Sequence, residues 1–428
     1  MVKNPSADLT YYTRAGDFRI DANGDVINQN GYKVQGWKLD DNGNLAGAIG
    51  SLNIPNSLNP KNTDSVKFEN PANLNADVES INQDEKKFDP SDSTTYSYVN
   101  TIKTYDSLGT AHTLKHYFVK TDIKTWRVFT QMDDRAVYYK NGSDTYASIE
   151  IQFNGDGSID TSNSIFKSKV SSERTDTISS GSNTLKNTPV IAGSVYISDS
   201  SGVIWNDDGA GNIVNIKTGE IEGSISYDDG KITITGQASG KLTAKYKDFS
   251  DSSTDSIPDV ANIQTDTINY SDKTSRYLNT GATNGAITEN FKNLTQLSSD
   301  FIFYAQQNGS GKGDLMSTSV TEDGVLKGTY TNGQIKDIAR LAVATFKDKE
   351  ILVRKGNNLY LPNQQTFTPI IVPGGVISKI RSGMLEMSNV DISQEFINLI
   401  TAQRAYQANA KTITTADQIL QTTMNIKR

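Results

Sequence analysis

The segment Ser224-Ile-Ser-Tyr-Asp-Asp-Gly-Lys-Ile-Thr-Ile-Thr235 decides the fold class, because its pattern recurs along most of the chain. Two short runs that alternate apolar and polar residues flank Asp229-Gly230. Alternation with a period of two is typical of a strand with one buried face. Asp-Gly tolerates the positive φ that a tight hairpin turn requires. The segment therefore predicts a β-hairpin.

Asn-Gly and Asp-Gly dipeptides punctuate the chain from about Tyr11 to Asn358, and each is a candidate reversal between antiparallel strands. The twelve dipeptides begin at Asn23, Asn30, Asn42, Asn141, Asn154, Asp156, Asp208, Asp229, Asn284, Asn308, Asp323 and Asn332. We therefore expect a mainly β, multidomain protein with antiparallel β-sandwich or barrel-like domains. The polar, proline-containing stretch from Asn53 to Asn75 is interpreted as an extended connector.

Composition excludes several classes of partner and chemistry. The 428 residues carry 42 Lys+Arg against 49 Asp+Glu, a formal net charge of −7, without a basic cluster of the kind that binds nucleic acid. No apolar stretch approaches the roughly 20 residues that a membrane span needs. We expect neither a nucleic-acid nor a membrane partner. Because cysteine is absent, disulfides, thiolate nucleophiles and zinc sites with sulfur ligands are excluded.

Candidate catalytic and metal sites are weak. His112 and His116 are the two histidines, and their even spacing in a strand-like run places both on one face, but without a third ligand we interpret them as surface histidines. The acidic loop that starts at Asp21 has Val26 at its sixth position and Tyr32 at its twelfth, where a calcium-binding EF-hand has Gly and Glu. We predict no enzyme activity, cofactor or metal.

From Asp391 to Lys427 the chain contains neither Gly nor Pro, and apolar residues recur at spacings of four and three. This heptad pattern predicts one long C-terminal α-helix suited to coiled-coil or tube packing. Asp391 is the expected N-cap, with Gln394 completing a capping box. The predicted assembly seam comprises Ile392, Phe396, Leu399, Tyr406, Ala410, Ile413, Leu420 and Met424.

Two partners for the helix remain open at this point. The helix packs against its own β body, or it pairs with helices of other molecules. Its other face is rich in Gln, Asn, Thr and Ala rather than in charged residues, and this weakly favours close packing among helices.

The run from Ser388 to Gln421 contains Asp391-Ile-Ser-Gln-Glu-Phe-Ile-Asn-Leu-Ile400 and Arg404-Ala-Tyr-Gln-Ala-Asn409, and it resembles the C-terminal signature of bacterial flagellar axial proteins. Tyr12–Phe18 with Gln35-Gly-Trp37, Leu341–Phe346 and Gly383–Asn389 are similar to other parts of the rod and hook proteins in that group. Thr104–Phe118 resembles the outer β domain of hook proteins. Within the group, the hook proteins match best.

The resemblance implies a structural subunit of the flagellar hook that self-assembles into a curved tube, outside the cell, and transmits motor torque to the filament as a universal joint. The implied partners are other copies of the chain, the distal rod, the hook–filament junction, the hook cap and the export apparatus. Members of the group begin with a long amphipathic helix that has no counterpart here, so we expect a truncated chain.

The expected domains are an inner β domain (1–90 and 326–387), an outer β domain (91–160 and 285–325), an inserted β domain without a recognised counterpart (161–284) and an assembly helix (388–428). Three alternatives remain. One is a distal rod or hook-associated protein, and another is a secreted adhesin or glycan-binding protein that uses Tyr196, Trp205 and Tyr227. The last is a secreted glycosidase.

Overall fold

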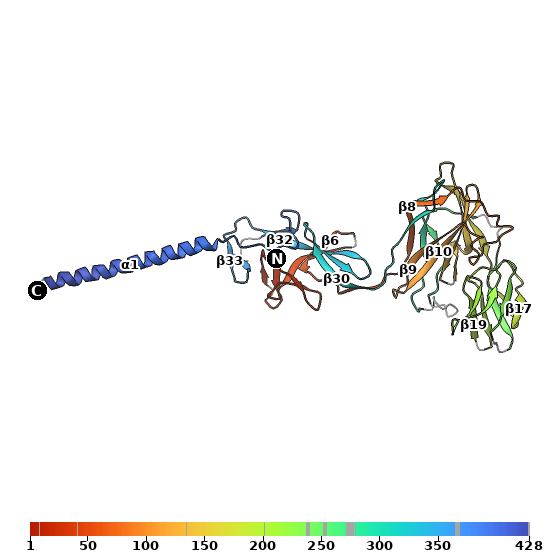
Figure 1. Cartoon of the computed structure of the whole chain (residues 1–428), viewed down its shortest axis with the longest axis horizontal. Helices are drawn as coiled ribbons and strands as arrows, with labels where there is room; N and C mark the ends of the chain where they lie inside the picture. Colours follow the sequence, from red (N-terminus) through yellow and green to blue (C-terminus); the bar gives the residue numbers. More distant parts are fainter. Residues whose placement is uncertain are drawn as a thin grey trace. The chain divides into compact units, whose positions relative to one another are not determined.

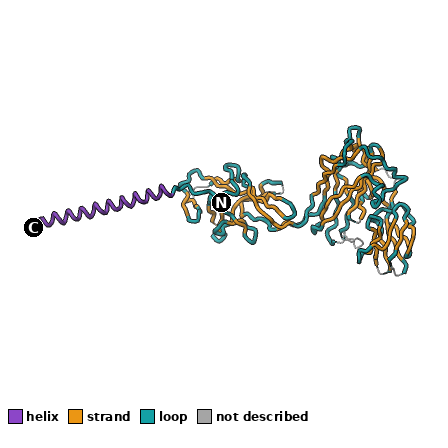
Figure 2. The backbone as a smooth tube through the Cα atoms, in the orientation of Figure 1, coloured by secondary structure: helices purple, strands orange, loops and turns teal. Residues whose placement is uncertain are grey.

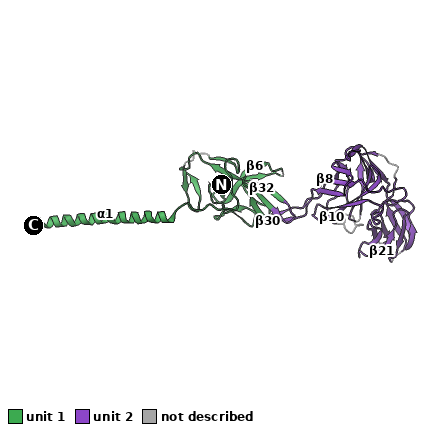
Figure 3. Cartoon of the chain, turned by 45° about the horizontal axis from the view of Figure 1, so that its top comes forward, with its two compact units in different colours: residues 1–56, 317–328, 335–428 green, residues 57–316, 329–334 purple. Residues whose placement is uncertain are grey.

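The computed structural model describes residues 1–428 except 8, 41, 134, 201, 237–239, 251–254, 271–277, 279, 364–368 and 427–428, and leaves the side chains of 202–204 undescribed. The chain forms two compact units (Figure 3). Unit 1 comprises 1–56, 317–328 and 335–428, and unit 2 comprises 57–316 and 329–334. Strands and loops build most of both units, and the long helix α1, Ile392–Ile426, belongs to unit 1 (Figures 1 and 2). The expectation of a mainly β chain with one long helix is confirmed.

Unit 1 is organised around one sheet. It contains β1 Val2–Asn4, β2 Leu9–Tyr11, β3 Arg19–Ile20, β4 Val26–Ile27, β5 Lys33–Leu39, β6 Leu45–Ser51, β32 Ile335–Thr345, β33 Leu352–Arg354, β34 Tyr360–Pro362 and β35 Ile370–Pro373, with parts of β30 Gly313–Val320 and β31 Val325–Tyr330. The sheet has the order β2-β1-β5-β32-β31-β30-β7, where β7, Ser57–Leu58, belongs to unit 2, and β33 and β34 form a separate two-stranded sheet. Where β5 crosses β32, Gly36 lies opposite Leu341, and a side chain on Gly36 would collide with the Arg340 carbonyl oxygen.

Unit 2 contains a β-sandwich. Its strands are β8 Ser65–Asn75, β9 Tyr98–Tyr105, β10 Ala111–Asp122, β11 Thr125–Met132, β12 Arg135–Val137, β13 Tyr139–Asn141, β14 Asp144–Phe153, β15 Ile159–Val170, β24 Phe249–Ser250, β25 Asp255–Ser256, β26 Ile263–Gln264, β27 Thr288–Asn290, β28 Leu294–Leu297 and β29 Ile302–Gln307. One sheet has the order β24-β15-β14-β11-β10-β9, and the other has β26-β27-β8-β28 with β29 beside β8.

The two sheets of this sandwich share one hydrophobic core. Phe68 on β8 stacks on Phe291 and meets Phe118 on β10 edge to face. The opposite face of β10 and β11 is covered by the segment before β9, where Phe88 stacks on Phe129 at 4.1 Å. Because both faces of β10 and β11 are covered, side chains of both orientations are buried along these strands, including the polar Lys120, Arg127 and Gln131.

A separate eight-stranded sheet is inserted between β15 and β24. Its strands are β16 Arg174–Ile178, β17 Gly181–Thr184, β18 Tyr196–Asp199, β19 Gly202–Asp207, β20 Asn212–Asn215, β21 Ile221–Ile225, β22 Lys231–Ile234 and β23 Leu242–Tyr246. The order β16-β23-β18-β19-β20-β21-β22-β17 places β16 and β17 at opposite edges, although only Ser179 and Ser180 separate them along the chain. The sheet must therefore curl around its own core, which includes Trp205, Ile213 and Leu242.

The hairpin prediction holds at most of the twelve dipeptides. Their glycines have positive φ at Gly24, Gly31, Gly43, Gly142, Gly157, Gly209, Gly230, Gly324 and Gly333. Each of these positions lies between two consecutive strands that are neighbours in a sheet. The turn chemistry thus sets where the chain reverses.

The interpretation of 53–75 as a connector is wrong for its second half. Residues 65–75 form β8, a central strand of the second sheet of the sandwich. Val66 and Phe68, and then Ala72 and Leu74, are buried at a period of two beneath a polar surface. Pro71 lies outside the described pairs of β8 with β27, β28 and β29, where its missing N–H is tolerated.

The boundaries of the two compact units differ from those of the four expected domains. The chain passes between units at 56/57, 316/317, 328/329 and 334/335. The inserted sheet begins at Arg174, inside the expected range 161–284. Compactness alone does not define an assembly domain, so the four-domain division stays a prediction.

Candidate assembly site

The helix α1 starts where its cap residue predicts. The carboxylate oxygen Oδ1 of Asp391 accepts hydrogen bonds from the backbone N–H groups of Ser393, at 2.8 Å, and Gln394, at 3.3 Å. These bonds satisfy two of the four N–H groups that a helix start leaves without partners. The expected reciprocal bond from Gln394 is replaced by a contact of its amide with Asn398, so only half of the capping box forms.

The predicted seam lies along α1 with every side chain exposed to solvent. The exposed fractions of its large apolar residues run from 53% at Leu399 to 82% at Ile392. Ala410 is also exposed, and no described residue of α1 is buried. The seam positions follow spacings of four and three, interrupted at Gln403 and Asp417, so the stripe turns slowly about a straight helix axis and fits a partner that coils with it.

Sequence reasoning missed a second apolar stripe. At 3.6 residues per turn, Ile397, Ile419 and Ile426 lie on the side of α1 opposite the seam, and all three are exposed. The stripe is visible in the sequence as a spacing of eleven residues from Ile397 through Ala408 to Ile419. A search for a seven-residue repeat does not detect this spacing.

Five threonines of α1 turn their hydroxyl groups inward. Thr401 Oγ1 donates to the carbonyl oxygen of Ile397 at 2.8 Å, and Thr412 Oγ1 donates to that of Ala408 at 2.9 Å. Thr414, Thr422 and Thr423 make similar bonds within the helix. Because these hydroxyls have partners in their own helix, the threonines contribute a surface that is less polar than the sequence indicates.

The segment that leads into α1 is also apolar and exposed. Met384, Leu385, Met387 and Val390 are all more than half exposed. Within this segment the carboxylate of Glu386 pairs with Arg14 at 3.0 Å. The exposed apolar surface therefore begins before the first residue of the helix.

The prediction of two surface histidines is wrong, because both side chains are buried. His112 Nδ1 lies 2.7 Å from Asp133 Oδ2, and its Nε2 lies 3.4 Å from Asp106 Oδ2. His116 Nε2 lies 2.9 Å from Glu289 Oε1. Carboxylates from other segments compensate for burying the rings, and sequence spacing gave no sign of these partners.

The environment of His112 shifts two pKa values. Burial by itself would lower the pKa of His112, but hydrogen bonds and charges from Asp133 and Asp106 outweigh it and raise that pKa. Burial would raise the pKa of Asp106, but hydrogen bonds from Thr280, Thr110 and His112 outweigh it and lower that pKa. The opposite shifts favour a charged pair in the interior.

The acidic loops are turns, as expected. Asp21 Oδ1 accepts the backbone N–H groups of Asn23 and Asp25, both at 2.9 Å, and Asp40 Oδ1 binds Asn42 and Asn44 in the same way. Across the described part of the chain, no group of three or more His, Asp or Glu is arranged to hold a metal ion.

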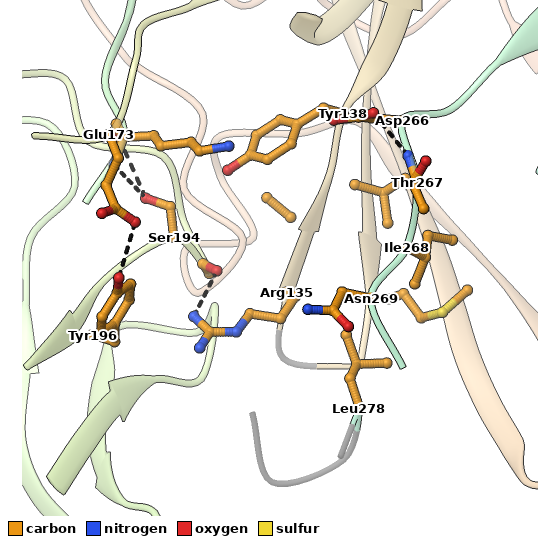
Figure 4. A pocket seen from close by; sticks show the side chains of 15 residues that line it. Arg135, Tyr138, Glu173, Ser194, Tyr196, Asp266, Thr267, Ile268, Asn269 and Leu278 are labelled. Atoms are coloured by element: carbon orange, nitrogen blue, oxygen red, sulfur yellow. Dashed lines mark hydrogen bonds between the residues drawn. The ribbon is translucent and has the colours of Figure 1, made fainter. Parts of the chain in front are cut away.

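A cavity of about 250 Å³ lies in unit 2, where the inserted sheet adjoins β12 and the segment 266–269 (Figure 4). The polar side chains around it bind the protein itself. Arg135 Nη1 donates to the Gly193 carbonyl oxygen at 3.0 Å, and Glu173 accepts from Tyr196 at 2.9 Å and pairs with Lys245 at 3.0 Å. The bond of Arg135, which lies on β12, fastens the inserted sheet to the sandwich, and the contacts of Glu173 lie within the inserted part.

Most of the aromatic residues on which the glycan-binding alternative depends are buried. Trp205 has no exposed surface and donates its Nε1–H to Glu222 at 2.7 Å, and Tyr227 is also buried. Tyr196 alone remains half-buried. Two of the three residues are therefore core residues and cannot stack on a sugar.

Among the described residues, no helix combines the length and the apolar character that crossing a membrane requires.

Three family models match the chain. Residues 1–76 match the flagellar hook protein FlgE/F/G D1 domain, and 73–217 match the flagellar basal body protein FlaE D2 domain. Residues 381–426, which include α1, match the C-terminal part of the flagellar basal body rod FlgEFG proteins. The D2 match reaches past residue 160 and into the inserted sheet, where no counterpart was expected.

The curated relatives include flagellar hook proteins of several bacteria. The chain is 26% identical to the flagellar hook protein FlgE of Salmonella typhimurium, over 97% of this chain and 77% of that protein. It is 27% identical to that of Treponema pallidum, over 99% of this chain and 77% of that protein. A superposition on the crystal structure of Helicobacter pylori flagellar hook protein FlgE2 covers 88% of this chain and 92% of that one, with 14% identity and a TM-score of 0.35.

Proposed function

Because this chain belongs to the flagellar hook protein family and is a structural subunit of the hook, we propose that the exposed seam of α1 is the surface through which it assembles. The seam residues are Ile392, Phe396, Leu399, Tyr406, Ala410, Ile413, Leu420 and Met424.

The observation that carries the proposal is the complete exposure of α1. Burying one Leu, Ile, Phe or Met side chain stabilises a structure by roughly 1.5–3 kcal/mol, and α1 buries none of its own. A helix gains most of its stability by packing an apolar face, so the seam needs a partner. Helices of neighbouring subunits supply a matching apolar surface when the polymer forms.

The β units contribute differently to a hook. Each has its own buried core, so a contact that shifts between neighbouring subunits does not have to break that core. In a bending tube the outer contacts lengthen on one side and shorten on the other, which favours polar, weakly specific surfaces. We propose that tightly packed helices carry torque while the β units at larger radius allow bending. This is the action of a universal joint.

As a hook subunit the protein self-assembles into a polymer with other flagellar axial components and is located in the hook, outside the cell. We further propose that its specific partners are the distal rod, the hook–filament junction proteins, the hook cap and the export apparatus. The proposed inner domain (1–90 and 326–387), outer domain (91–160 and 285–325), inserted domain (161–284) and helix (388–428) would occupy successive radii of the tube.

A charge in the seam tests the proposal. Leu399→Asp and Ile413→Asp, each made in the chain expressed in a hook-building cell, place a carboxylate in the proposed helix contact. We expect hooks to be lost in electron micrographs, because burying an unpaired charge is costly. Gln418→Asp is the matched control, since it puts the same residue on α1 outside the seam and should leave hooks intact. Normal hooks from both seam variants would refute the proposal.

A further inference from the structure

The two strands β7 and β30, at which the chain passes between unit 1 and unit 2, are joined by few backbone pairs. Two of the four places where the chain passes between units lie in neighbouring strands, one before Ser57 at the start of β7 and the other after Met316 within β30. Strand β7 and the start of β30 pair through only Leu58–Gly313 and Ser57–Asp314. Just inside, Lys61 and Ser310 exchange backbone hydrogen bonds of 2.9 and 2.8 Å. On its other side β30 pairs with β31, and the backbone N–H of Thr331 donates to the Asp314 carbonyl oxygen at 2.9 Å. Strand β7 itself is only two residues long and lies at the edge of this sheet, so its direction needs support from elsewhere.

The turn from Asp106 to Thr110, which joins β9 to β10, lies against the ribbon that β7, β30 and the residues beside them form. Gly109 in this turn has φ of +85°, and a Cβ added there would lie 2.8 Å from Pro60 Cβ and 3.3 Å from the backbone nitrogen of Lys312. The turn thus touches both connecting segments at once. Only glycine allows both the positive φ and the close approach.

The strand before the turn is also joined to the ribbon. The backbone N–H of Thr63 donates to the Tyr105 carbonyl oxygen at 2.8 Å, and the backbone N–H of Tyr105 donates to Thr63 Oγ1 at 2.9 Å. Thr63 Oγ1 in turn donates to Gln307 Oε1 at 2.9 Å, which reaches the second segment. The ribbon is therefore fixed to the end of β9 and to the turn that follows.

We propose that the turn Asp106–Thr110 is a buttress that sets the direction and the stiffness of the connection leaving unit 2. The buttress transfers the rigidity of the β-sandwich to the narrow edge at which β7 joins β30.

A buried cluster holds the turn in place. Asp106 has no exposed surface, and its Oδ1 accepts the backbone N–H groups of Leu108 and Thr110 at 2.9 and 2.8 Å. Its Oδ2 accepts the hydroxyl of Thr280 at 2.7 Å and faces the ring of His112. Four contacts on one carboxylate fix the turn from inside.

The far side of the cluster is equally constrained. Asp133 has a positive φ of 51°, which is uncommon outside glycine, and its Oδ1 accepts the backbone N–H of Thr113 at 2.8 Å. Its Oδ2 holds the other nitrogen of His112. His112 therefore links the turn to the end of β11, and it acts on the ribbon only through Asp106, as a positioning residue.

The test replaces the glycine that makes the contact. Gly109→Ala puts a methyl group against Pro60, whereas Gly142→Ala, the matched control, has a similar positive φ with nothing within 4 Å of the added atom. Because the chain has no cysteine, exposed Lys38→Cys in unit 1 and Thr161→Cys in unit 2 can carry two spin labels without interference. Pulsed dipolar spectroscopy of the unassembled chain then measures the spread of distances.

We expect Gly109→Ala to broaden the distance distribution and to speed amide exchange at Lys61 and Ser310 about tenfold, while Gly142→Ala changes neither. An equal effect of both variants, or none from Gly109→Ala, would overturn the proposal. If Gly109→Ala loses exchange protection throughout β10 and β11, Thr280→Val decides instead. It removes one bond to Asp106 and should broaden the distribution to a smaller extent, and an unchanged distribution would overturn the proposal.

Discussion

The inserted sheet of residues 174–246 and the helix α1 differ in whether their apolar residues are buried within the chain. Both are separate parts of the chain with repeated apolar residues. The sheet curls around Trp205, Ile213 and Leu242 and buries them within itself. The helix leaves all of its apolar residues in solvent. A sheet that curls supplies both sides of a core, whereas a single helix supplies one side.

The difference separates two sources of stability. The inserted sheet is stable through contacts made inside one molecule, and its exposed surface is mostly polar. The helix depends on its own hydrogen bonds and caps, because none of its described residues is buried. A change in the sheet should therefore alter folding, and a change in the helix should alter assembly.

The largest expected effect comes from Trp205→Ala. Removing a fully buried indole and its bond to Glu222 should lower the free energy of unfolding of the inserted sheet by about 3–5 kcal/mol. Chemical denaturation with amide exchange as the readout measures it, because exchange reports each sheet separately. Protection should fall in β18 to β23 and persist in β10, β11 and α1.

Ile221→Ala is the control for that variant, since Ile221 belongs to the same sheet and is exposed. It should change the free energy of unfolding by less than about 0.5 kcal/mol. If Trp205→Ala removed protection from the sandwich to the same degree, the inserted sheet and the sandwich would fold as one cooperative unit, and the sheet would not be self-contained.

An intermediate effect is expected from pH. Because the folded pKa of His112 is raised above its ordinary value of 6.5, its contribution to stability is fully present below pH 6.5 and is lost as the pH rises through the folded value. The groups that face the ring are Asp106, Asp133 and Tyr270. Burial raises the pKa of Tyr270 to about 12, so this phenol stays neutral in that range.

Urea denaturation of unit 2 at a series of pH values above 6.5 checks the sign. Stability should fall with rising pH in the unaltered chain, and the slope should be reduced in His112→Gln. The folded pKa of Asp106 is lowered, so its own contribution is lost only in acid, as the pH falls through that lowered value. A slope unchanged by His112→Gln would show that another group causes the dependence.

The smallest effect is expected at the start of α1. Asp391→Ala removes the acceptor for two backbone N–H groups and should cost the helix about 1 kcal/mol, with less helical signal in circular dichroism. Asp391→Asn keeps an acceptor and should retain the signal. The β units should denature identically in all three chains, and any shift in their midpoint would contradict the independence of α1.

Local chemistry allowed much of this fold to be predicted from the sequence. Gly24, Gly230 and Gly333 lie in turns because Asn-Gly and Asp-Gly favour the required φ, and this needs no knowledge of distant contacts. The start of α1 was predictable for the same reason, since Asp391 bonds to residues only two and three positions away.

The errors arose where partners are distant in the sequence. Strand β8 was hidden by its Asn and Pro residues, and it is stabilised by β27, β28 and β29, more than two hundred residues further along. The burial of His116 depends on Glu289 in the same way. The candidate seam was fully predictable as a pattern, but its partner is not part of the described chain, so the pattern could not identify it.

The inward-turned hydroxyls of Thr401, Thr412, Thr422 and Thr423 have a consequence for friction. A surface on which hydroxyls cross-link neighbours resists sliding, because each small step breaks bonds that must form again. When the hydroxyls are already bonded to their own helix, methyl groups remain to touch the neighbour, and dispersion contacts change gradually with displacement. A face of this kind offers little resistance to a helix that moves along it, which suits a tube that bends as it rotates.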